Sequence, residues 1–297
     1  MSGTRGQRVS VGQSIPHSPD VRTVREGVRG KERLLVYELP EDALGAGSSL
    51  GNDKAWINSK ATGALERLFS LDLGQVVAGS MVVRYSAPQH GLVPDAALPG
   101  QGPRQRGAYC HHEGRVHLNQ ARPGVFRIHP GYQERAFDLP GSIAVRETLF
   151  IPNTLEEDPA VVYQVITLRN ESSSTRPLHV TAFANLRGAT PEDVEGCFDK
   201  ELGALLAWNT SQTGWVRVLG FSEPAADYMT THDVSRADDP VSASELTRQV
   251  RAKGSLFGVV EVGVDLAPGE AKRLAVVLAF SPRGPAEARR IFIEARD

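Results

Sequence analysis

Short segments rich in β-branched and aromatic residues recur along this sequence, separated by Gly, Pro, Asn or Ser. Residues 161–168 read VVYQVITL and residues 178–183 read LHVTAF, with a polar stretch between them. This spacing is typical of an antiparallel sandwich or barrel, so the sequence predicts an all-β fold. Further strands are expected at Leu34–Leu39, Trp56–Ser59, Val76–Ser86, Val125–His129, Ile143–Ile151, Gly203–Asn209 and Trp215–Phe221.

Two β-hairpins are expected in the second half of the chain. The first joins residues 161–168 to 178–183, and the second joins Phe257–Leu266 to Lys272–Phe280. Pro268-Gly269 lies between the strands of the second pair. Pro favours the first corner of a type II turn, and Gly tolerates the positive φ of the second corner.

The pattern changes at the two ends of the chain. Residues 1–33 carry seven basic and three acidic residues and no apolar segment of the kind that a secretory signal needs. We expect a flexible basic tail there and a sandwich over residues 34–282. At residues 283–297, Pro285 precedes a run of good helix formers. This segment predicts the start of a linker helix that leads to a further domain.

Composition narrows the classes of partner. The chain has 33 basic and 35 acidic residues, a formal charge of −2, which gives no field to attract nucleic acid or anionic lipid. No apolar run approaches the roughly 18 residues of a membrane-spanning helix. Cys110 and Cys197 are too few for a disulfide framework, which favours reduced thiols in a cytoplasmic protein. No Gly-rich phosphate loop, Gly-x-Ser-x-Gly elbow or Cys-x-x-Cys motif is present, so no cofactor is expected.

The order of several segments resembles the N-terminal domain of family 94 glycoside phosphorylases, which include cellobiose and chitobiose phosphorylases. The matching segments are Val145–Pro152, Pro159–Ser172, Leu178–Phe183, Phe198–Ala207, Leu266–Glu270 and Ala286–Ala295. The resemblance covers roughly residues 50–297 and is loosest in the N-terminal third. Similar domains precede the catalytic domains of bacterial glucoamylases.

The resemblance implies a large two-sheet antiparallel supersandwich of the galactose mutarotase-like type. In these families the catalytic carboxylates lie on an (α/α)₆ barrel that follows the linker helix, so no residue of this chain is assigned as catalytic. The leading hypothesis is therefore a non-catalytic carbohydrate-associated domain. It would pack on such a barrel, shape the rim of an oligosaccharide site and supply a homodimer surface.

A cluster at residues 109–117 provides candidate sugar contacts. If this segment is one strand, alternate residues share a face: His111, Glu113, Arg115 and His117. Gly114 argues against the helix that a zinc-binding His-Glu-x-x-His motif needs, so no metal is expected. We name Tyr109, His111, Glu113 and Trp215 as candidate carbohydrate contacts, with a solvated sheet face as the alternative for the cluster and core packing as the alternative for Trp215.

Other polar residues leave several possibilities open. Glu134, Asp138 and Glu147 alternate with Arg127, Arg135 and Arg146. For these residues surface ion pairing is expected, rather than acid–base catalysis. A second functional hypothesis is an aldose-epimerase type of enzyme, in which His179 would act with Glu261 or Glu270. A third is a stand-alone carbohydrate-binding module, with Trp56, Trp208 and Trp215 as the aromatic residues able to stack on a sugar or to fill the core.

Overall fold

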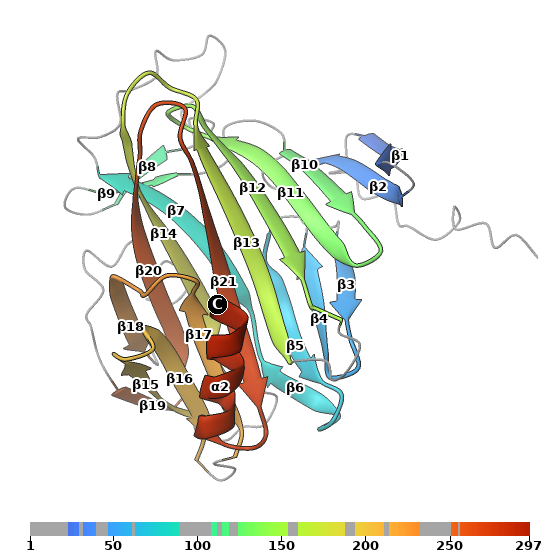
Figure 1. Cartoon of the computed structure of the whole chain (residues 1–297), viewed down its shortest axis with the longest axis vertical. Helices are drawn as coiled ribbons and strands as arrows, with labels where there is room; N and C mark the ends of the chain where they lie inside the picture. The colour runs from blue at the N-terminus through green and yellow to red at the C-terminus, as the bar shows by residue number, and fades with distance from the viewer. Residues whose placement is uncertain are drawn as a thin grey trace, which may run out of the picture.

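The computed structural model shows two antiparallel β-sheets packed face to face, with a helix on the outer face of one sheet (Figure 1). The structure describes residues 23–29, 32–39, 47–60, 63–88, 108–111, 115–118, 124–153, 160–187, 194–210, 214–231, 251–254 and 256–297. Within these ranges, sheet A has 11 strands and sheet B has 10. The predicted all-β sandwich with a C-terminal helix is confirmed.

The order of the strands mixes early and late segments of the chain, and every pairing is antiparallel. In spatial order, sheet A contains β1 (Thr23–Arg29), β2 (Glu32–Leu39), β10 (Gly124–Ile128), β11 (Tyr132–Leu139), β12 (Ile143–Phe150), β13 (Val161–Asn170), β21 (Ala271–Ser281), β17 (Val216–Phe221), β16 (Ala204–Asn209), β15 (Val194–Asp199) and β19 (Arg251–Gly254). The main path of sheet B contains β18 (Asp227–Thr231), β20 (Phe257–Leu266), β14 (Arg176–Asn185), β7 (Met81–Pro88), β5 (Leu65–Ser70), β4 (Ala55–Lys60) and β3 (Gly47–Gly51). Beside this path, β6 (Gln75–Ala78) pairs with β5, β9 (Arg115–Leu118) with β7, and β8 (Ala108–His111) with β9.

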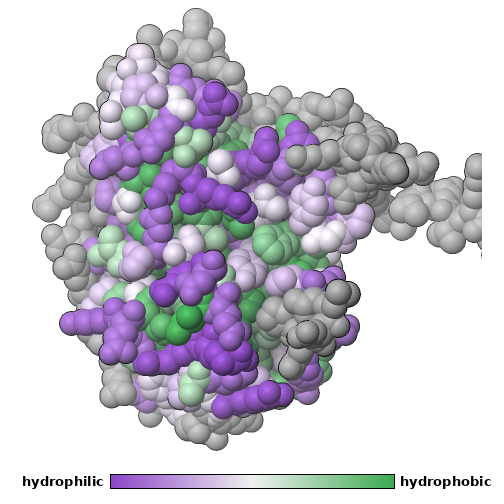
Figure 2. All heavy atoms as spheres, viewed as in Figure 1, coloured by the Kyte–Doolittle hydropathy of each residue, from purple (hydrophilic) through white to green (hydrophobic). Residues whose placement is uncertain are grey.

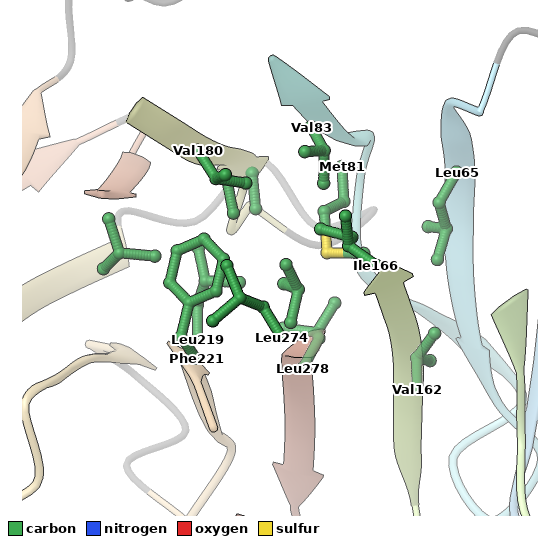
Figure 3. Close-up of a cluster of buried hydrophobic side chains, with 14 of the residues drawn as sticks. Leu65, Met81, Val83, Val162, Ile166, Val180, Leu219, Phe221, Leu274 and Leu278 are labelled. Carbon is green, nitrogen blue, oxygen red and sulfur yellow. The ribbon is translucent and has the colours of Figure 1, made fainter. Parts of the chain in front are cut away.

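The main core lies between the two sheets. In β12, residues alternate between buried and partly exposed positions, as expected for a strand with one face in a core. Figure 3 shows side chains of both sheets converging in this layer: Leu65, Met81, Val83 and Val180 from sheet B, and Val162, Ile166, Leu219, Phe221, Leu274 and Leu278 from sheet A. Burial of these apolar side chains is the main contribution to stability.

Neither predicted hairpin forms. β13 lies in sheet A between β12 and β21, whereas β14 lies in sheet B between β7 and β20. The chain likewise passes from β20 in sheet B to β21 in sheet A. The predicted turn at Pro268-Gly269 does form. Gly269 has a positive φ of 76°, and the Glu270 N–H donates to the Ala267 carbonyl at 3.0 Å. Alternating apolar residues place a strand against a core, but they do not say which sheet it joins.

Asn170 ties the two sheet-crossing connections together. Its backbone N–H donates to the Glu270 carbonyl and its own carbonyl accepts the Gly269 N–H, both at 2.9 Å. Its side-chain Nδ2 donates to the carbonyls of Ser174 at 2.7 Å and Leu266 at 2.9 Å. The fully buried Asn170 therefore links the end of β13 to the β20–β21 turn.

The predicted strand Val76–Ser86 is in fact two strands, β6 and β7. The break falls at Gly79, whose N–H donates to the Asn185 carbonyl at 2.8 Å, while Asn185 N–H donates to the Ser80 carbonyl at 2.7 Å. The Asn185 side chain occupies the space that a Cβ on Gly79 would need. β6 thus ends just before this close contact with Asn185, and β7 begins just after it.

The sheet also begins earlier than expected. The sequence predicts a tail over residues 1–33, but Thr23–Arg29 form β1 and pair with β2. Thr and Val favour extended backbone, and the charged residues among them obscure this strand in the sequence. The preceding residues of the predicted tail lie outside the described part of the chain.

Helix α2 (Pro285–Arg296) covers part of the outer face of sheet A, as Figure 1 shows. Its buried residues Ala288 and Phe292 join a second apolar cluster with outward-facing residues of β13, β16, β17 and β21. Tyr163 Oη donates to the Ala295 carbonyl at 3.0 Å, and Arg296 donates to the Leu202 carbonyl at 2.9 Å. In Figure 2, hydrophilic side chains cover most of this face and hydrophobic atoms show in patches between them.

Candidate functional site

An imidazole and a carboxylate meet on the outer face of sheet B, which is turned away from sheet A. Val180 on β14 and Val262 on β20 are buried in the main core. Because side chains alternate along a strand, His179 and Glu261 project from the opposite face. Nδ1 of His179 lies 3.0 Å from Oε1 of Glu261. The register brings them together, since Thr181 pairs with Glu261.

Glu261 is held in place by two polar neighbours. It is 3% exposed, its Oε1 contacts His179, and Thr181 Oγ1 donates to its Oε2 at 2.9 Å. The His179 side chain, in contrast, is 26% exposed. A carboxylate on one ring nitrogen fixes the orientation of an imidazole and leaves the other nitrogen for a ligand. His179 can therefore hydrogen-bond a hydroxyl, or exchange a proton with one, at Nε2.

From the sequence, both Glu261 and Glu270 are possible partners of His179. The structure pairs His179 with Glu261. Glu270 lies in the β20–β21 turn, where its Oε2 accepts the N–H of Ala267 at 2.8 Å. The carboxylate of Glu270 therefore stabilises a turn.

The cluster at residues 109–117 is not one strand, contrary to prediction. The backbone forms two antiparallel strands, β8 and β9, in which Tyr109 pairs with His117 and His111 pairs with Arg115. Glu113 lies outside the described residues, and so do the side chains of Tyr109 and His111. The positions of His111, Arg115 and His117 still share one face, because paired positions on two neighbouring strands, and positions two apart within a strand, lie on the same side of a sheet.

The register nevertheless relates this segment to His179. Ser86 on β7 pairs with His179 on one side and with His117 on β9 on the other. Tyr109, His117, Ser86 and His179 thus occupy one row of paired positions across β8, β9, β7 and β14. The sequence indicates Tyr109 as a site residue and His179 as an alternative, and only the register of the strands places them in one row.

The three tryptophans occupy different environments. Trp215 is partly buried and packs against the main core, beside the entrance of β17. Trp208 is partly buried against the second cluster. Trp56 is 37% exposed and lies edge-to-face with Phe69, with ring centroids 6.1 Å apart. Trp56 is thus the most exposed of the three tryptophans, and the proposed role of Trp215 in sugar contact remains a prediction.

Two of the three predicted surface carboxylates form ion pairs, in different places. Glu134 pairs with Arg127 at 2.5 Å and lies 3.9 Å from Arg146. Glu147 is not on the surface, because it projects between the sheets. There it accepts the Tyr85 hydroxyl at 2.6 Å and pairs with Arg135 at 3.3 Å.

Tyr85, Arg135 and Glu147, which we call the Glu147 cluster, link the two sheets, because Tyr85 lies in sheet B and the other two lie in sheet A. Burial, followed by the charge of Glu147, raises the pKa of Tyr85 well above its usual range. Gly63 leaves room for the cluster, since a Cβ there would lie 2.6 Å from Arg135 Nη1 and 2.8 Å from Glu147 Oε2. The charges are satisfied by one another inside the sandwich and leave little for a substrate.

A pocket of about 680 Å³ lies beside the start of α2, on the outer face of sheet A. Its lining consists of Cys197, Leu206, Trp208, Gly214, Val216, Gly284, Pro285, Ala286 and Arg289. Arg289 forms an ion pair with Asp199. A sugar placed here would lose water from its hydroxyls and meet few polar groups in return, so the pocket is a poor sugar site despite its tryptophan.

The described residues contain neither a metal-binding cluster nor a membrane-spanning helix. No group of three or more His, Cys, Asp or Glu side chains is arranged to hold a metal ion there. None of the helices in that part of the chain is long and apolar enough to cross a membrane.

Comparison with known proteins defines the fold but no family. No family model matches the sequence, and no curated protein matches it. Among solved structures, a bacterial glucoamylase complexed with acarbose is similar at 10% identity and a TM-score of 0.52, covering 93% of this chain and 37% of that chain. At this identity the likeness shows a shared sandwich fold. The chain spans little more than a third of the glucoamylase.

Two further structures are less similar. A putative aldose 1-epimerase from Escherichia coli K12 has 11% identity and a TM-score of 0.45, covering 80% of this chain and 99% of that chain. A putative kojibiose phosphorylase from human microbiome has 11% identity and a TM-score of 0.42, covering 89% of this chain and 35% of that chain.

Proposed function

We propose that this chain is a non-catalytic carbohydrate-associated domain of a glycoside hydrolase or phosphorylase. It would pack on an (α/α)₆ catalytic barrel outside the sequence described here and shape the rim of the oligosaccharide site. The observation that carries the proposal is the partial match to the glucoamylase, which takes in 93% of this chain and 37% of the other. The motif order that resembles family 94 keeps phosphorylases, beside hydrolases, among the candidate parent enzymes.

The packing of α2 supports this role. The helix is fixed to sheet A by Ala288 and Phe292 along one face. On the other side, Arg290 bonds to both Glu287 and Glu294. Ion pairs of this kind stabilise an exposed helix surface only modestly. A helix anchored to a rigid sheet would hold a domain joined to it at a fixed angle.

The test is an activity comparison between the isolated chain and the native polypeptide captured with an antibody against it. Both are incubated with α- and β-linked glucans, with and without inorganic phosphate, and released sugars are measured. We expect cleavage by the native polypeptide and none by the isolated chain. Glycosidic cleavage by the isolated chain, or inactivity of the native polypeptide on every glucan, would contradict the proposal.

The oriented His179 favours a second candidate, an enzyme of the aldose-epimerase type. In such a reaction one group protonates the ring oxygen of a sugar while a base removes the proton of the anomeric hydroxyl. His179 is suited to the proton transfer. Glu261 is suited only to orienting His179, because both of its oxygens are engaged. Saturation-transfer NMR of glucose anomers tests this candidate: a rate equal to that in buffer, for wild type and His179→Asn alike, would exclude it.

Location and assembly are also proposals. We propose a cytoplasmic protein, which the low cysteine content supports. A homodimer is proposed as well. Sedimentation velocity of the isolated chain would test it, with a single species of about 32.1 kDa as the contrary result.

A further inference from the structure

Gly263 lies inside the ten-residue strand β20, and the fold does not require a glycine there. Its φ is not among the positive values found at other glycines. A Cβ at this position would meet no atom within 4 Å. A glycine inside a strand weakens it, and often marks a place where a ligand or another backbone approaches closely. Gly263 is exposed, so a ligand can reach it.

The pairing of β20 places Gly263 directly opposite His179. The Glu261 carbonyl accepts the Ala226 N–H at 2.8 Å, on the side away from β14. Backbone groups of residues two apart point to the same side of a strand, so those of Gly263 also point away from β14. His179 and Gly263 are therefore a non-hydrogen-bonded pair, in which Cα atoms lie about 4.5 Å apart.

The described strand β18, on the side of β20 away from β14, does not reach Gly263. β18 pairs with β20 from Thr231 opposite Phe257 to Asp227 opposite Glu261. Within the described strands, none continues this pairing beyond Glu261. The N–H and C=O of Gly263 thus point toward the edge beyond the last β18 pair, on the side of β20 opposite to β14 and His179.

A second carboxylate lies on the same face. Asp265 follows Gly263 by two residues and is exposed. It is a diagonal neighbour of His179 across the two strands, a position about 7–8 Å away. We call the surface formed by His179, Gly263 and Asp265 the Gly263 shelf. The shelf has a flat floor without a side chain, an imidazole at one side and a carboxylate at the end.

We propose that the Gly263 shelf binds a neutral saccharide ring. Imidazole, carboxylate and backbone groups are all suited to hydrogen bonding with hydroxyls, and a bare Cα admits the C–H face of a pyranose. The carboxylates of Glu261 and Asp265 disfavour an anionic ligand. This inference rests on the proposed association with carbohydrate, and names where the chain itself would contact the sugar.

The test is a titration of the isolated chain with glucose, maltotriose and cellotriose, followed by amide chemical shifts and calorimetry. We expect binding to wild type and at least a tenfold loss, about 1.4 kcal/mol, in Gly263→Leu. Gly131→Leu is the matched control, because a Cβ there also meets nothing within 4 Å. His179→Asn and Asp265→Asn should each weaken binding as well.

Two results would overturn the shelf: equal affinity of wild type and Gly263→Leu, or no binding of any of the three sugars to wild type. If Gly263→Leu does not fold, the wild-type shifts decide. Sugar must then move the amide of Gly263, and shifts confined to other strands refute the site. The proposed function is tested separately, by whether the native polypeptide cleaves a glucan.

Discussion

Replacing Asn170 by Ala would test the idea that one side chain locks both sheet-crossing connections. The side chain makes four hydrogen bonds: Nδ2 donates to Ser174 at 2.7 Å and Leu266 at 2.9 Å, and Oδ1 accepts from Ser172 N at 2.9 Å and Ser172 Oγ at 2.7 Å. Each bond contributes about 0.5–1.5 kcal/mol net. Water can replace partners at the partly exposed Ser172, so we expect a loss of about 2–4 kcal/mol.

Equilibrium unfolding in urea, followed by tryptophan fluorescence, measures this loss. Ser173→Ala is the matched control, because Ser173 lies in the same connection and is exposed. The control should stay within about 0.5 kcal/mol of wild type. The same small change in Asn170→Ala would show that the two connections are held by backbone contacts alone, which would refute this reasoning.

Three further predictions concern buried or oriented groups. Because the pKa of Tyr85 is raised in the folded protein, its contribution to the free energy of unfolding is fully present below about pH 10 and is lost as pH rises through the raised pKa. In Tyr85→Phe, the free energy of unfolding in urea should therefore fall less steeply with pH above about pH 10 than in wild type. An equally steep fall in both proteins would contradict this. Gly220→Ala should cost about 1–3 kcal/mol by overpacking, since its Cβ would lie 2.6 Å from Phe292 Cζ; equal urea midpoints for this variant and Gly131→Ala would refute the clash. Nitrogen-15 NMR should find the neutral His179 ring protonated at Nδ1, and the Nε2–H tautomer would rule out Glu261 as its acceptor.

Sequence patterns predicted the elements better than their connections. The alternation in Ile143–Phe150 and the Pro at the start of α2 identify a strand and a helix, because these signals are local. Whether β13 pairs with β14 is decided by which long strands lie beside each of them. That depends on β7, β12, β20 and β21 together, and no short window of sequence contains all of them.

The site was predictable only in parts. His179 and Glu261 are 82 residues apart in numbering, and only the register of β14 with β20 brings them within 3.0 Å. Gly263 did leave a signal, since an isolated Gly inside a strand pattern suggests a close backbone approach. Glu147 shows the opposite case: its charge suggested the surface, but Tyr85 and Arg135 satisfy it inside the sandwich.

The mass of the native polypeptide tests the central claim most directly. An antibody raised against this chain would be used to probe an extract of the organism that encodes it, and the captured band would be sequenced by mass spectrometry. The proposal predicts one polypeptide well above 32.1 kDa that contains this sequence and a helical barrel. A native polypeptide of about 32.1 kDa, with no barrel joined to it, would contradict the claim.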